Sequence, residues 1–429
     1  MIADTCQVPL ILMAASASPA QAAGNLVYAN TTYVEDILAA ESKEGTRVYA
    51  ATRGGVEVYS LDTKERVAHY TSAHGLPTLH IRKVSLADDK LVAWTAAQRC
   101  VLQDERFHCT EQSAMPNVEP TLAGRMGGAR ITKTLRHRGH SLVATAGSGL
   151  WIGGTDPSRL TPTNQICSNH MMAITSFAGR TFFGSFDQGL CSTEDGVLFR
   201  THPGDFRMVN DLEATPYGLF VASGEGLYRS KDGVTFEKVE SVSQRGVNGL
   251  AFDGRSLWVT TPGALWRVRI HGGPSNRQYW RPGGARSLQA VSARDGQVWI
   301  ATEDRGLVKK TGANRFQVFD RAAGLPASWV LDVAIDAEGT AYGATLRDGI
   351  VAVNSEGVIE QVDGAPDTWT LFVDAHQHGL SIGTQGGAAE VRGDKTLAMG
   401  VLPHPNVHVM ARAHGKLYLG TEGGTVVRR

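Results

Sequence analysis

An apolar five-residue phrase ending in Thr or Ser recurs ten times along this 429-residue chain. The copies end at Thr52, Thr95, Thr145, Ser185, Ser223, Thr261, Thr302, Thr345, Thr384 and Thr421. Successive endpoints lie 37 to 50 residues apart, with a mean of 41. Periods of this length indicate stacked copies of one supersecondary unit, in which each copy needs its neighbours to bury its apolar face.

Each period has the pattern of four short strands. A first strand, such as "VNDLEA" at 209–214, leads through a turn to the apolar phrase, and a Gly-containing turn leads to a third strand. Most copies add a more polar fourth strand. Four strands in about 41 residues match a propeller blade, and neighbouring blades on both faces explain why the phrase is continuously apolar. We predict an all-β β-propeller of about ten four-stranded blades, in which the closing Thr or Ser satisfies backbone groups at the turn.

The two ends of the chain indicate how the propeller closes. The last copy stops after its third strand, at "GTEGGTVVRR", and "GNLVYAN" at 24–30 resembles a lone fourth strand. Pairing the two would complete the final blade and remove exposed sheet edges. We expect one ring over residues 24–429, because no Pro- or Ser-rich linker interrupts the chain. Two smaller propellers are the alternative, since ten blades exceed the usual four to eight.

Residues 1–22 resemble a secretory signal peptide. An apolar core at 8–17 precedes Ala20 and Ala22, which have the spacing of an A-x-A cleavage site. The first seven residues contain Asp4 and no Lys or Arg, which departs from that pattern. We expect export to the periplasm or the medium of a bacterium; a buried or disordered N-terminus is the alternative.

Cleavage there would leave four cysteines: Cys100, Cys109, Cys167 and Cys191. The segment "CVLQDERFHC" is symmetric about Asp104 and Glu105, so a two-residue hairpin turn would place its two cysteines opposite each other with Cα atoms about 4.5 Å apart. That spacing is at the short end of what a disulfide tolerates. Cys167 and Cys191 would form the second bridge by elimination. Four buried free thiols in a cytosolic protein are the alternative.

Charge and motifs argue against several functions. Lys plus Arg and Asp plus Glu each number 42, so no excess positive charge favours nucleic acid. No apolar run reaches the length of a transmembrane segment. We find no G-x-S-x-G elbow or phosphate-binding loop and expect no cofactor. Close histidine pairs occur at 137/140, 376/378 and 404/408, but no acidic partner sits at a telling spacing, and we expect no metal site.

The repeat resembles a known family. "HGLPTLHIRKVSLADDKLVAWT" (74–95) and "AGLPASWVLDVAIDAEGTAYGAT" (323–345) resemble the two-component regulator propeller repeat, as do "GLWIGG", "QVWIATEDRGL" and "GKLYLGTEGG". The resemblance covers nearly the whole mature chain and implies an extracytoplasmic ligand-sensing propeller. Such propellers are often attached to a membrane helix and a histidine kinase, neither of which this sequence contains.

Two segments carry a second resemblance. "STEDGVLF" (192–199) and "SKDGVTF" (230–236) are similar to the Asp-box turns of sialidase-type propellers and of the ten-bladed sortilin luminal domain. The resemblance implies a folding device, in which Asp and Ser hydrogen-bond the hairpin above a packed ring. It does not imply sialidase activity, because no Arg triad with a Tyr/Glu pair can be placed.

The candidate ligand site is positional. The first strand of each blade borders the central channel, and its polar residues could hold a ligand at the channel mouth. These residues are Glu35, Asp36, Arg82, Lys83, Thr132, Lys133, Asn210, Asp211, Asn248, Gln289, Asp332 and His408. Alternatively they hydrogen-bond one another and ordered water. Trp280 and Trp329 could stack on a sugar, or pack between blades.

The expected function is binding without catalysis. We expect an exported, monomeric propeller that binds an unknown small molecule, glycan or protein as a sensor or interaction module. One alternative is an exported lyase or glycoside hydrolase acting on polysaccharide, which would need an acid/base pair near the mouth. A structural scaffold of the cell envelope is the other, and would show a contiguous apolar patch.

Overall fold

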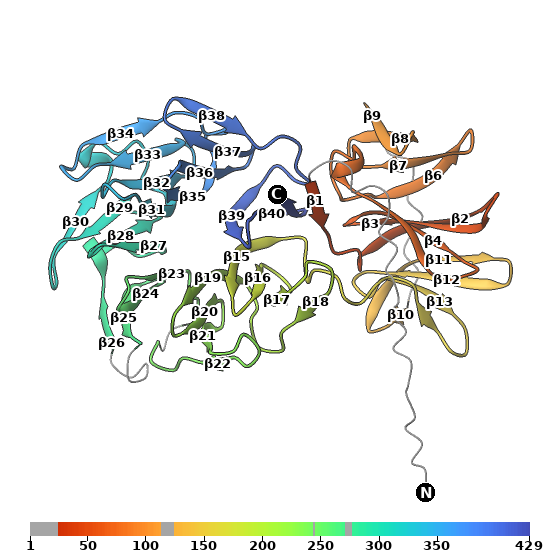
Figure 1. The fold of residues 1–429 in the computed structure, drawn as a ribbon, viewed down its shortest axis with the longest axis horizontal. Coiled ribbons are helices and arrows are strands. Elements are labelled where there is room, and N and C mark those ends of the chain that lie inside the picture. Colours follow the sequence, from red (N-terminus) through yellow and green to blue (C-terminus); the bar gives the residue numbers. More distant parts are fainter. Residues whose placement is uncertain (1–24, 113–123, 243–244, 271–276) are drawn as a thin grey trace, which may run out of the picture.

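The computed structural model describes residues 25–112, 124–242, 245–270 and 277–429. This part of the chain folds into ten antiparallel sheets, and its helices are three short 3-10 turns (Figure 1). None of these turns is long enough to cross a bilayer. The expected signal peptide at 1–22 lies outside the described residues.

Each sheet, here called a blade, corresponds to one copy of the repeat. Blades 1 to 3 come first in the chain. Blade 1 contains β2 (Val34–Ser42), β3 (Gly45–Thr52), β4 (Gly55–Ser60) and β5 (Arg66–Tyr70); blade 2 contains β6 (Lys83–Ala87), β7 (Lys90–Trp94), β8 (Gln98–Gln103) and β9 (Arg106–Glu111). Blade 3 has five strands: β10 (Arg125–Met126), β11 (Ala129–His137), β12 (His140–Thr145), β13 (Leu150–Gly153) and β14 (Ser158–Arg159).

Blades 4 to 9 continue in chain order. Blade 4 contains β15 (Met171–Phe177), β16 (Arg180–Ser185), β17 (Leu190–Thr193) and β18 (Phe199–Thr201); blade 5 contains β19 (Val209–Thr215), β20 (Gly218–Ser223), β21 (Gly226–Ser230) and β22 (Glu237–Lys238); blade 6 contains β23 (Gly249–Phe252), β24 (Ser256–Thr261), β25 (Ala264–Arg269) and β26 (Arg277–Trp280). Blade 7 contains β27 (Leu288–Arg294), β28 (Gln297–Thr302), β29 (Leu307–Lys310) and β30 (Phe316–Phe319); blade 8 contains β31 (Val330–Ile335), β32 (Ala341–Thr345), β33 (Ile350–Val353) and β34 (Ile359–Val362); blade 9 contains β35 (Thr370–His376), β36 (Gly379–Thr384), β37 (Gly387–Arg392) and β38 (Lys395–Ala398).

Blade 10 joins the two ends of the described chain. It contains β39 (Val407–Ala413), β40 (Lys416–Thr421), β41 (Gly424–Arg428) and β1 (Asn25–Tyr28). Leu26 pairs with Val427, and Val27 pairs with Val426. The predicted pairing of the N-terminal strand with the last blade is therefore confirmed.

The apolar phrase forms or ends the second strand of every blade, as predicted. In all ten copies, the closing hydroxyl donates a hydrogen bond to a backbone carbonyl three or four residues later. In blade 1, for example, Thr52 Oγ1 donates to the Gly55 carbonyl at 2.8 Å and accepts from the Gly54 N–H at 2.9 Å. The repeated Thr or Ser is thus structural, because it holds the turn between strands two and three.

Side chains of the second strand alternate between two neighbouring blades. In blade 5, Phe220 and Ala222 pack on blade 6, whereas Leu219 and Val221 pack on blade 4. In blade 1, Val48 and Ala50 contact blade 3, whereas Ala51 contacts blade 2. Each blade therefore has a face that meets the following blade and a face that meets the preceding one, as the period-two geometry of a strand requires.

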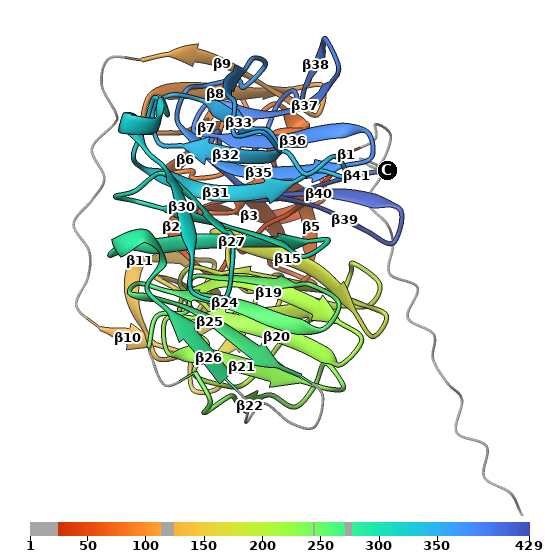
Figure 2. The same cartoon turned by 90° about the vertical axis from the view of Figure 1, so that its left-hand side faces the viewer.

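These faces divide the ten blades into two sets. Blades 4 to 10 form a closed ring of seven, in which β39 of blade 10 lies beside β15 of blade 4 and a cluster containing Phe183 and Tyr418 packs between them. Blades 1, 2 and 3 form a separate three-blade group in the spatial order 3–1–2, because β11 and β6 lie beside β2. Figure 1 shows the group beside the ring, and in Figure 2 the ring lies in front of the group.

The expectation of one ring is therefore corrected. Blade 10 meets blade 4 instead of blade 1, and the three-blade group lies between β1 and β15 in the sequence. Every blade has one face that packs on the following blade, here called a following-type face, and one preceding-type face that packs on the blade before it. Any following-type face can meet any preceding-type face, so the repeat in the sequence does not show which blades are neighbours. The arrangement agrees better with the alternative of two smaller units.

Two crossing segments connect the group to the ring. One runs from β1 to β2 and the other from β14 to β15. Asn30 and Asn169 clamp them together: the Asn30 N–H donates to Asn169 Oδ1 at 2.6 Å, and Asn169 Nδ2 donates to the Asn30 carbonyl at 2.9 Å. The Cys167–Cys191 disulfide, with Cα atoms 5.8 Å apart, ties the second crossing segment to β17. The junction is thus held by polar contacts and one covalent bond.

The hairpin predicted from "CVLQDERFHC" is confirmed. Cys100 pairs with Cys109 across β8 and β9, their Cα atoms are 4.0 Å apart, and the two form a disulfide. Asp104 and Glu105 both have positive φ, at 47° and 62°, as a tight two-residue hairpin turn requires. The symmetry of the segment was therefore sufficient to predict both its turn and its bridge.

Candidate ligand site at the mouth of the seven-blade ring

Two positions in each blade define the mouth of the ring. One is the residue before the first strand, and the other is the residue after the closing Thr or Ser; both lie at the end of the blade where the first strand begins. A backbone hydrogen bond joins them repeatedly, from Phe186 to His170 at 3.1 Å and from Leu346 to Trp329 at 3.1 Å. The same bond recurs in blades 5, 7 and 9. Side chains at these positions therefore surround the channel entrance.

Several of these mouth positions carry exposed apolar side chains. Phe186, Met208 and Trp329 are each 43% exposed. The guanidinium of Arg347 lies 5.1 Å from the ring centre of Trp369, the mouth residue of blade 9. Exposed aromatic and thioether groups around a concave entrance are typical of ligand sites, because they supply contact area at a low entropic cost.

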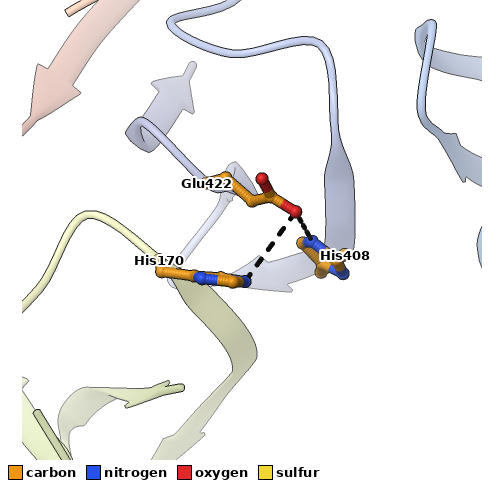
Figure 3. A group of neighbouring side chains, drawn as sticks. All are labelled: His170, His408 and Glu422. Carbon is orange, nitrogen blue, oxygen red and sulfur yellow. Dashed lines mark hydrogen bonds and ion pairs between the residues drawn. The ribbon is translucent and has the colours of Figure 1, made fainter. Parts of the chain in front are cut away.

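A polar cluster lies where blade 10 meets blade 4. His170 precedes β15, His408 is on β39, and Glu422 follows β40; Figure 3 shows the three side chains converging. His408 Nε2 lies 2.9 Å from Glu422 Oε1, and His170 Nε2 lies 4.0 Å from the same oxygen. The closure of the ring brings these groups together, since 252 residues separate His170 from Glu422.

The surroundings of the cluster determine its charge. Burial lowers the pKa of His170 and of neighbouring His404, which favours the neutral imidazole. Burial alone would raise the pKa of Glu422, but hydrogen bonds from Asn406 and His408 outweigh it, so this pKa is lowered. Asn406 Nδ2 donates to Glu422 Oε1 at 3.0 Å. The cluster therefore combines the Glu422 carboxylate with imidazoles, of which His170 and His404 are held toward the neutral form by burial.

Three of the predicted channel residues hold adjacent blades together. Asp211 Oδ2 accepts the Leu250 N–H of blade 6 at 2.7 Å, and Asp332 Oδ2 accepts the Val373 N–H of blade 9 at 3.0 Å. Asp36 makes the equivalent bond to blade 2, at 3.1 Å, and is also bonded to Lys133 of blade 3. These carboxylates act across blade interfaces, where each satisfies a backbone N–H group of the following inner strand.

Other predicted residues also bond to the following blade. Asn210 Nδ2 donates to the Val247 carbonyl at 2.8 Å, and Asn248 Nδ2 donates to the Leu288 carbonyl at 2.7 Å. Thr132 Oγ1 makes the corresponding bond to blade 1. This agrees with the alternative that the polar inner-strand residues hydrogen-bond within the protein.

The remaining candidates lie in two separate places. Gln289 Nε2 donates to Glu303 at 2.7 Å, at the mouth of the ring. In the three-blade group, Glu35 contacts Arg53 and His80, each at 3.0 Å. Arg82 is exposed, and Lys83 is half-buried and has an interaction partner. Because the group and the ring are distinct, the candidates do not line one common channel.

The sequence missed two members of the polar cluster, His170 and Glu422. The sequence did not predict a metal site at His404 and His408, because no acidic residue lies at a suitable spacing from them. The structure brings Glu422 to His408 from the turn after β40. Comparing the residue after Thr421 with its equivalents in other copies could have indicated a mouth position. The two tryptophans differ: Trp329 is exposed at the mouth, whereas Trp280 stacks on Trp258 at 5.8 Å.

Known structures share the fold. The extracellular domain of the hybrid two-component system BT3049 of B. thetaiotaomicron is 13% identical, with a TM-score of 0.54 over 91% of this chain and 61% of that chain. PorZ, a surface component of the type-IX secretion system of Porphyromonas gingivalis, is 15% identical, with a TM-score of 0.53 over 94% and 69%. YCF48 bound to D1 peptide is 11% identical, with a TM-score of 0.50 over 62% and 95%.

These similarities establish the propeller fold. The chain spans about three fifths of the length of the BT3049 domain. No family model and no curated protein matches the sequence.

The buried inner-strand aspartates predict a pH effect on stability. Burial raises the pKa of Asp332 to about 7, against 3.8 for a free side chain, although two backbone N–H groups oppose this. Well below pH 3.8 the Asp332 carboxyl is protonated in both the folded and the unfolded forms, and it has no effect on stability. As pH rises from 4 to 7 the unfolded state ionises first, so Asp332 removes folding stability at up to about 1.4 kcal/mol per pH unit.

Substitution of Asp332 isolates this effect. Asp332→Asn cannot ionise, so its free energy of unfolding relative to the unsubstituted protein should increase between pH 5 and pH 8. Chemical denaturation at both pH values measures the difference. Asp295→Asn is the matched control, because its side chain is 83% exposed and its difference should not change with pH. If the difference in the free energy of unfolding were the same at pH 5 and pH 8, Asp332 would already be ionised in the folded protein at pH 5, which would contradict the prediction.

Proposed function

We propose that this chain is an exported, non-catalytic propeller that binds a ligand or a protein partner at the mouth of the seven-blade ring. The observation that carries this proposal is the combination of exposed Phe186, Met208 and Trp329 with the His170–His408–Glu422 cluster on one mouth. Exposed apolar contact area beside a few convergent polar groups is the usual composition of a binding site.

Export is supported by three observations. The two disulfides suit an oxidising compartment. Solved structures with this fold include the extracellular domain of BT3049 and the surface component PorZ. The sequence also places a signal-like segment at 1–22. We infer from these a periplasmic or secreted protein whose relation to the two-component regulator propellers is one of fold and of ligand sensing.

The two Asp-box-like segments support the folding role that we propose for them. In the first, the Val197 and Leu198 N–H groups donate to Asp195 Oδ1 at 2.7 and 2.9 Å. In the second, the Val234 and Thr235 N–H groups donate to Asp232 Oδ1, both at 2.8 Å. Each Asp thus satisfies two backbone N–H groups of its turn, which accounts for the motif without any catalytic role.

The test is a binding screen with paired variants. Thermal-shift measurements on the full chain against panels of oligosaccharides, peptides and divalent cations should find a class that raises the melting temperature, because such a ligand binds only the folded form. Trp329→Ala and Phe186→Ala should abolish that shift. Tyr279→Ala is the matched control, since Tyr279 is 62% exposed on the outer strand of blade 6, away from the mouth.

Two results would contradict the mouth as the binding site. One is a shift that survives both mouth variants but is lost in Tyr279→Ala. The other is turnover of any oligosaccharide in the panel, which would favour the polysaccharide enzyme instead.

A further inference from the structure

We propose that His170, His408 and Glu422 bind a divalent transition-metal ion of the Zn²⁺ class at the junction of blades 10 and 4. The inference deepens the proposed function, because it assigns a metal to the same mouth. Two imidazoles and one carboxylate form a common ligand set for zinc sites that keep a position open. Their donor atoms all lie within 4.8 Å of one another.

The geometry requires only a small adjustment. Zinc ligands at about 2.0–2.2 Å lie roughly 3.3 Å apart in a tetrahedral site. His408 and Glu422 are already 2.9 Å apart, whereas His170 Nε2 lies 4.0 Å from Glu422 and must approach it by less than 1 Å. Phe186 stacks on the His170 ring with centroids 4.9 Å apart and so restricts its orientation.

Neighbouring groups complete the second coordination sphere. Asn406 donates to Glu422 at 3.0 Å. His404 Nδ1 lies 4.0 Å from Glu422 Oε2 but accepts the Asn406 N–H at 3.2 Å, so His404 is engaged elsewhere. Three protein ligands therefore leave a fourth position, which faces the mouth and could accept an anionic oxygen of a ligand.

Metal titration of the full chain tests this assignment. Isothermal titration with Zn²⁺ should show about one ion per chain, and Co²⁺ should give the visible absorption of a four- or five-coordinate site. Glu422→Gln and His408→Ala should each weaken Zn²⁺ binding more than about 100-fold. His378→Ala, at an exposed position outside the cluster, is the matched control and should bind normally.

The outcome separates this inference from the proposed function. Zn²⁺ binding that is absent from the unsubstituted chain, or equally strong in Glu422→Gln, would overturn the metal site. The titration needs no mouth ligand, so it tests the metal site alone. If no metal binds, the proposed binding of an oligosaccharide or peptide at the mouth is still tested separately by the thermal-shift screen.

Discussion

The packing of one blade's second strand between two neighbours is the interaction on which the rest of this structure depends. Alternate side chains of each apolar phrase point to the two neighbouring blades, so every sheet has one face that packs on the following blade and one that packs on the preceding blade. Burial of these faces supplies most of the driving force for folding, since a single four-stranded sheet cannot bury its own apolar surface. Asp211 and Asp332 accept hydrogen bonds from backbone N–H groups of the next blade, and Asn248 donates one to a carbonyl there, which adds directional contacts at the inner edge.

This interaction fixes neighbours locally but leaves the size of the ring open. Blade 10 closes on blade 4, where Tyr28 of β1 also packs edge-on against Phe199 with ring centroids 5.0 Å apart. The Asn30–Asn169 clamp and the Cys167–Cys191 bridge then set the three-blade group apart. Closure also creates the polar cluster, because His170 comes from the first blade of the ring and Glu422 from its last. The closure of blade 10 on blade 4 therefore produces both the seven-blade ring and the candidate site.

Features governed by local chemistry could be predicted from the sequence. The hydroxyl of Thr52 and its nine equivalents, the hairpin of Cys100 and Cys109, and the pairing of Leu26 with Val427 all follow from strand alternation and turn geometry. The order of the blades in space could not be predicted, because equivalent faces do not encode which partner they meet. The cluster was missed for the same reason, since its members become neighbours only after the ring closes between blades 10 and 4.

The adjacency of blades 4 and 10 is tested most directly by crosslinking. The chain would carry Cys6→Ser with His170→Cys and His408→Cys, and the other four cysteines stay in disulfides. Dibromobimane becomes fluorescent when it joins two nearby thiols, and we predict a fluorescent intramolecular crosslink in the monomeric fraction. In the matched pair Thr132→Cys with His170→Cys, position 132 of blade 3 corresponds to position 408 of blade 10, so this pair would be close if blade 3 preceded blade 4 in the ring. A crosslink in that pair and none between 170 and 408 would contradict the seven-blade ring.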